Sequence, residues 1–60
     1  MTLQTIREIR ACSRFLKHND VRAWKQELKN IALRENIDEK QVLRIYHART
    51  ADELLAAAEE

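Results

Sequence analysis

The sequence predicts an all-α fold: a small bundle of three to four helices built on an N-terminal antiparallel helical hairpin. The 60 residues include no glycine and no proline, which supply most tight turns and flexible linkers. Most residues are strong helix formers, and β-branched residues never alternate as they would in a strand. Apolar residues instead recur every three or four positions, the period of a helix. We expect one domain over residues 1–60.

The first helix is expected over residues 5–17. Thr5 and Glu8 have the spacing of a capping box, in which each side chain bonds the other residue's backbone N–H. Thr2 offers an earlier start. One face of this helix carries the apolar residues Ile6, Ile9, Cys12 and Leu16.

The second helix is expected over residues 20–35, with Asn19 or Asp20 as its N-cap. Asn36 suits the left-handed position that follows a helix. The seam of this helix consists of Val21, Trp24, Leu28 and Ile31. A connection of two or three residues then predicts an antiparallel hairpin with the first helix.

Capping signals at Asp38 and Thr50 predict helices over residues 39–49 and 51–58. On one uninterrupted helix, Leu54 and Leu55 would lie nearly opposite Val42 and Ile45. Either the helix breaks near Thr50, or its end faces a different partner.

Composition also bounds the cell compartment. A single cysteine, Cys12, forms no internal disulfide and fits a reducing compartment. No apolar run has the roughly 20 residues of a membrane span, and the N-terminus lacks the order of a signal peptide. We expect a cytoplasmic protein with no membrane association. Its size is that of many small bacterial, plasmid or phage regulatory genes.

The sequence predicts no enzyme, no cofactor and no metal site. Cys12, His18 and His47 lack the spacing of metal ligands. No nucleophile and base have a scaffold to hold them, and a domain this small has little room for a substrate pocket.

Charge is split along the chain. Residues 1–34 hold eight Lys/Arg and three Asp/Glu, which gives +5, whereas residues 35–60 hold three and seven, which gives −4. The expected basic face consists of Arg7, Arg10, Arg14 and Lys17 on the first helix and Arg22, Lys25 and Lys29 on the second. In a hairpin these two clusters can merge into one surface. An ordinary solvated face, a contact for an acidic protein and a contact for nucleic-acid phosphates all remain open.

A helix-turn-helix is an alternative use of residues 28–47. Its expected spacing of small, turn and apolar positions is met by Ala32, Asn36, Ile37, Val42 and Ile45. Glu35, however, stands where an apolar residue should pack before the turn. Asp38 and Glu39 would repel phosphates at the start of the recognition helix.

Three apolar side chains exceed what the expected seams need: Phe15, Leu33 and Leu43. Trp24 lies within the seam of the second helix, where it serves either the core or the anchor of a dimer. The surplus side chains are open to two interpretations. They either pack against a third helix or form an interface with another molecule. Because so small a chain buries a thin core, a symmetric dimer is attractive. We therefore expect a non-enzymatic helical regulator or adaptor that self-associates as a homodimer and binds a protein partner, with an acidic partner as one form. Nucleic-acid binding is the alternative.

Overall fold

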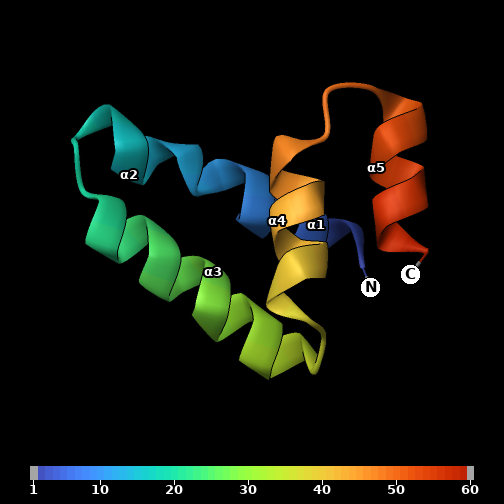
Figure 1. The fold of residues 1–60 in the computed structure, drawn as a ribbon, viewed down its shortest axis with the longest axis horizontal. Helices are drawn as coiled ribbons and strands as arrows, with labels where there is room; N and C mark the ends of the chain where they lie inside the picture. The colour runs from blue at the N-terminus through green and yellow to red at the C-terminus, as the bar shows by residue number, and fades with distance from the viewer. Residues whose placement is uncertain (1, 60) are drawn as a thin grey trace.

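The computed structural model describes residues 2–59, which form a small all-α bundle and contain no strand. Its helices are α1 (Leu3–Ala11), α2 (Ser13–Lys17), α3 (Val21–Glu35), α4 (Glu39–His47) and α5 (Ala51–Ala58). Figure 1 shows α1 and α2 running back against α3 as the two arms of a V, with α4 crossing its open end. Helix α5 packs on the other side of α4. The predicted all-α fold, a small bundle of helices packed together, is confirmed.

The first helical segment differs from the expected helix 5–17 at both its start and its middle. Thr2 caps α1, because its hydroxyl accepts the Thr5 N–H at 3.2 Å. The helix then breaks at Cys12, whose N–H bonds the Ile9 carbonyl three residues back at 3.2 Å. The predicted capping box of Thr5 and Glu8 is wrong, because both side chains bond α3 instead.

Asparagine ends two of the helical segments. Asn19 and Asn36 have φ values of 56° and 57°, the left-handed conformation in which glycine is usual. After Asn36, the Ile37 N–H bonds the Ala32 carbonyl at 3.0 Å and so closes the end of α3. Asp20 caps the start of α3 by accepting the Ala23 N–H at 3.0 Å. Both chain reversals are therefore made without glycine.

The segment between α4 and α5 settles the boundary that the pattern left open. Helix α4 ends at His47, two residues before its expected end, and Thr50 caps α5 by accepting the Glu53 N–H at 3.2 Å. The Glu53 carboxylate accepts the Arg49 N–H at 2.8 Å. Because the chain breaks here, Leu54 turns back and packs against the core.

The core lies where α1, α3 and α4 meet. Its buried members are Ile9, Cys12, Leu28, Ile31, Ala32, Val42, Ile45 and Ala57. Two residues of the predicted hairpin seam lie outside it: Leu16 is 38% exposed and Val21 is 51% exposed. Leu16 lies near the end of α2 and Val21 begins α3, so the two residues flank the turn that joins these helices. The expected seam therefore stops short of the turn.

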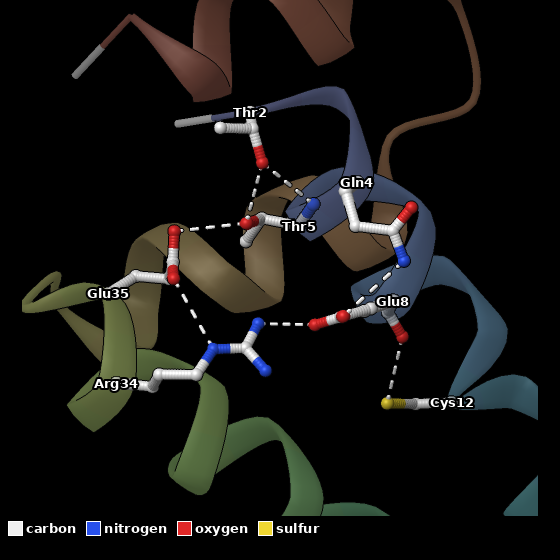
Figure 2. Close-up of polar contacts among 7 residues, drawn as sticks. All are labelled: Thr2, Gln4, Thr5, Glu8, Cys12, Arg34 and Glu35. Atoms are coloured by element: carbon white, nitrogen blue, oxygen red, sulfur yellow. Dashed lines mark hydrogen bonds and ion pairs between the residues drawn. The ribbon is translucent and has the colours of Figure 1, made fainter.

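A polar network ties α1 to the end of α3 (Figure 2). The Thr5 hydroxyl, which is buried, donates to Glu35 Oε1 at 2.9 Å. Arg34 forms ion pairs with both Glu35 and Glu8. The hydrogen bond that Arg34 donates to Glu8 is the main reason that the pKa of Glu8 lies below its ordinary value. Glu35 therefore serves the α1–α3 contact, which explains a charged residue just before the turn.

Candidate functional site

The basic residues of α1 and α2 are all exposed, but two of them are engaged within the fold. Arg10 Nη1 donates to the carbonyls of Ile45 and Ala48, at 3.1 and 2.9 Å, where α4 ends. The Arg14 guanidinium lies 4.8 Å from the centre of the Phe15 ring, in cation–π geometry. Arg10 is therefore better explained as a structural residue than as a contact for a partner.

The second basic cluster lies beside a groove. Arg22, Lys25 and Lys29 follow the i, i+3, i+7 spacing on α3, and all three are exposed along the side of α3 that borders α4. The three charges thus lie in one row over about two turns of helix.

The groove between α3 and α4 has a volume of about 680 Å³. Its apolar surface is supplied by Trp24, Leu28 and Leu43, and its basic rim by the row on α3. Glu39 and His47 contribute the wall on α4. Three Lys/Arg against one glutamate give these lining residues a net charge of +2 with His47 neutral. An apolar surface beside a positive row is the main chemical character of this site.

Aromatic rings pack against one another beside the groove. The Trp24 and Tyr46 rings pack edge to face, with centroids 5.4 Å apart and planes at 69°. Tyr46 in turn meets His47, with centroids 5.1 Å apart. Trp24 is half-buried, and its Nε1 is buried without a hydrogen-bond partner among residues 2–59. Trp24 therefore joins the core to the groove surface.

The two expected basic clusters do not come together in this groove. None of the cations of α1 and α2 is among its described lining residues. On the α1–α3 side, the ion pair of Glu8 and Arg34 neutralises charge instead. The structure thus divides the expected basic face into a groove row on α3 and a separate set on α1 and α2.

The four apolar residues considered as interface candidates, Phe15, Trp24, Leu33 and Leu43, fall into two groups. Phe15 and Trp24 are half-buried and pack against the core. Leu33 is 72% exposed, and Leu43 lines the groove with 37% exposure. Leu33 and Leu43 therefore remain available to a partner.

Sequence reasoning missed the α4 wall. Glu39, Leu43 and His47 lie four residues apart from one another, so a single stripe of α4 carries them. That spacing was present in the sequence, but its meaning depends on α3 lying beside this stripe.

A smaller hollow of about 360 Å³ lies between α4 and α5. Its lining includes Arg44 and Glu53 around the small side chains of Ala48, Ala56 and Ala57. It offers no large apolar side chain to anchor a ligand.

The expected helix-turn-helix segment, residues 28–47, comprises the second half of α3, the turn at Asn36 and α4. Lys40, Arg44 and His47 are exposed on α4. The Asp38 carboxylate accepts the Lys40 N–H at 2.8 Å and so caps α4, while Glu39 lies in its first turn. Negative charge therefore stands at the end of α4 that a recognition helix directs toward DNA.

Metal binding and thiol chemistry are the other kinds of site that these side chains bear on. Residues 2–59 contain no group of three or more His, Cys, Asp or Glu side chains placed to hold a metal ion. Cys12 is buried, its Sγ donates to the Glu8 carbonyl at 3.3 Å, and burial raises the pKa of its thiol. No helix in this part of the chain has the length and apolar character to cross a membrane.

Comparison with known proteins adds no relative. No family model matches the chain, and no curated protein or solved structure matches it significantly. Function must therefore be argued from the groove itself.

Proposed function

We propose that this protein is a small non-enzymatic adaptor or regulator that binds an acidic amphipathic helix of a protein in the α3–α4 groove. One observation carries the proposal: an apolar surface of Trp24, Leu28 and Leu43 lies beside a basic row on α3. A helix that docks in a groove uses apolar side chains at i, i+3 and i+7 as anchors. Acidic residues beside those anchors would meet the basic row.

The positive charge of the groove rim favours a partner with negative charge. Opposite charges across an interface speed encounter and fix register, while like charges exclude wrong partners. Trp24 is the side chain best suited to anchor the contact, because half-buried aromatic residues often dominate binding energy.

The proposal includes self-association and a cytoplasmic location. A thin core and the exposed Leu33 and Leu43 favour contact with further protein surface. The single free thiol of Cys12 fits a reducing compartment.

An NMR titration tests this function. The probe is an alanine-based helical peptide of about 20 residues with leucines at i, i+3 and i+7 flanked by glutamates. We expect shifts concentrated on Trp24, Leu43 and their neighbours, with binding that weakens as salt rises. The matched control peptide carries lysines in place of the glutamates and should not bind. Absence of shifts along the groove with either peptide would refute the proposal.

Nucleic-acid binding is the alternative function. The observation that favours it is the exposed row of Arg22, Lys25 and Lys29 on α3, together with the exposed Lys40 on α4. A mixed-sequence DNA duplex of about 20 base pairs should then bind with a steep salt dependence, because phosphate contacts release counterions. Duplex binding at physiological salt, together with failure of the acidic peptide, would favour this alternative.

A further inference from the structure

The outer face of α5 carries an acidic stripe with an apolar centre. Asp52, Leu55 and Glu59 stand at i, i+3 and i+7, so they share one face of the helix. All three are exposed, and Leu55 has 59% of its surface accessible although it is a large apolar residue. We call Asp52, Leu55 and Glu59 the α5 stripe.

The position of Glu59 is unfavourable within a single molecule. It lies at the C-terminal end of α5, where the helix dipole repels negative charge. A cation from outside the helix would relieve this repulsion. The described part of α5 has no basic residue in its last turn to do so.

The α5 stripe matches the groove in length, charge and apolar content. Both the stripe and the basic row on α3 extend over eight residues, so their end residues lie about 10.5 Å apart along a helix. The carboxylates at the two ends of the stripe are as far apart along the helix as Arg22 and Lys29 are on α3. Leu55, between the carboxylates, is the apolar counterpart of the apolar surface of the groove.

The stripe cannot fill the groove of its own molecule while α5 keeps its place. Figure 1 shows α4 between α3 and α5. Gln41 Nε2 donates to the Ala57 carbonyl at 3.0 Å, a buried hydrogen bond that fixes α5 on the far side of α4. The residues of the stripe point away from that contact.

We infer that a second copy of this chain occupies the groove, its α5 stripe lying along the basic row on α3 in a reciprocal two-fold dimer. The inference rests on the proposed function, because it assigns the occupant of the same groove. A two-fold arrangement places each α5 in the other molecule's groove and so forms the contact twice. An acidic partner helix would compete with this dimer for the groove.

Sedimentation equilibrium from about 10 µM to about 1 mM tests the inference, since small interfaces give weak complexes. The groove variant is Lys25→Glu with Lys29→Glu, and the stripe variant is Asp52→Lys with Glu59→Lys. Each variant should self-associate at least about tenfold more weakly than the wild type, a loss of about 1.4 kcal/mol. The control variant Arg7→Glu, on the outer face of α1, should self-associate as the wild type does.

Mixing the two variants gives the decisive result. The groove variant has an acidic groove and an acidic stripe, whereas the stripe variant has a basic groove and a basic stripe. Each repels itself, but together they present opposite charges at both contacts. We expect the mixture to recover association to within about threefold of the wild type.

A single substitution controls for unfolding as the cause of weaker association. Glu59→Lys alone improves the match to the helix dipole of α5. Weaker association in this variant therefore cannot come from a less stable helix.

A wild type that stays monomeric throughout, or a mixture that does not recover association, would overturn the inference. The proposed binding of an acidic helix would survive, without the self-association proposed with it, if the acidic peptide still shifted Trp24 and Leu43 in that monomer. Failure of the peptide with a dimer that responds to the charge reversals would instead restrict the groove to self-association.

Discussion

Arg10 Nη1 and the Ala48 carbonyl are 2.9 Å apart although 38 residues separate them in the chain. The same nitrogen donates to Ile45, so one guanidinium satisfies two carbonyls at the end of α4. Carbonyls in the last turn of a helix have no partner within the helix, and a cation there also complements the dipole.

Arg10→Ala should therefore destabilise the fold by about 1–2 kcal/mol, because two charge-assisted hydrogen bonds are lost. Urea denaturation followed by circular dichroism measures this change. Arg7→Ala is the matched control on the outer face of α1 and should alter the free energy of unfolding by less than about 0.5 kcal/mol. Equal effects of the two substitutions would contradict a structural role for Arg10.

Asn36 should tolerate glycine but not alanine. Its φ of 57° lies in the left-handed region, where a residue with an ordinary Cβ costs about 1 kcal/mol. Asn36→Ala should lower the free energy of unfolding by that amount, whereas Asn36→Gly should stay within about 0.5 kcal/mol of the wild type. Asn30→Ala, within α3, is the control and should not destabilise, because alanine favours helix. Thermal denaturation of the three variants distinguishes these outcomes.

Thr5 and Glu35 should be energetically coupled. The Thr5 hydroxyl donates to Glu35 at 2.9 Å across the α1–α3 contact. A double-mutant cycle of Thr5→Val and Glu35→Ala should give a coupling free energy of about 1 kcal/mol, measured by urea denaturation. Strict additivity of the two substitutions would show that this hydrogen bond does not form in solution.

Acid should weaken the fold through Glu8. Arg34 hydrogen-bonds its carboxylate and lowers the pKa of Glu8 in the folded state. A group with a lowered folded pKa stabilises the protein above its unfolded pKa and loses that contribution as pH falls through the folded pKa. The free energy of unfolding should therefore decrease below about pH 5, and less steeply in Glu8→Gln. A wild type and a Glu8→Gln variant with the same slope against pH would contradict this assignment.

Local signals in the sequence were enough to predict most helix boundaries. Asp38, Thr50 and Asn36 act through hydrogen bonds to backbone a few residues away, so their roles follow from spacing alone. The start of α1 also has a local signal, because Thr2, the earlier start that the sequence offered, caps the helix through the Thr5 N–H. The choice between Thr2 and Thr5 could not be made locally, because Thr5 and Glu8 bond residues of α3. Where a side chain can bond either a nearby backbone group or a distant residue, tertiary packing determines which hydrogen bond forms.

The candidate site was half visible in the sequence. The row of Arg22, Lys25 and Lys29 follows from helical spacing, and Leu43 stood out as a surplus apolar residue. That these residues border one groove depends on how α4 crosses α3. The expected joining of the two basic clusters did not account for Arg10, whose guanidinium caps α4.

The contact between α4 and α5 bears on which helices separate first when the fold opens. Gln41 donates to the Ala57 carbonyl, and α5 contributes Leu54 and Ala57 to the core. When α5 moves away from α4, water can take the place of Ala57 on the Gln41 amide, and these two side chains leave the core. Separation of α1, α3 and α4 would instead expose Ile9, Ile31 and Val42 at once. We therefore expect α5 to separate from the bundle before α1, α3 and α4 separate from one another. The amide hydrogens of α5 should then exchange with solvent ahead of those of the other three helices.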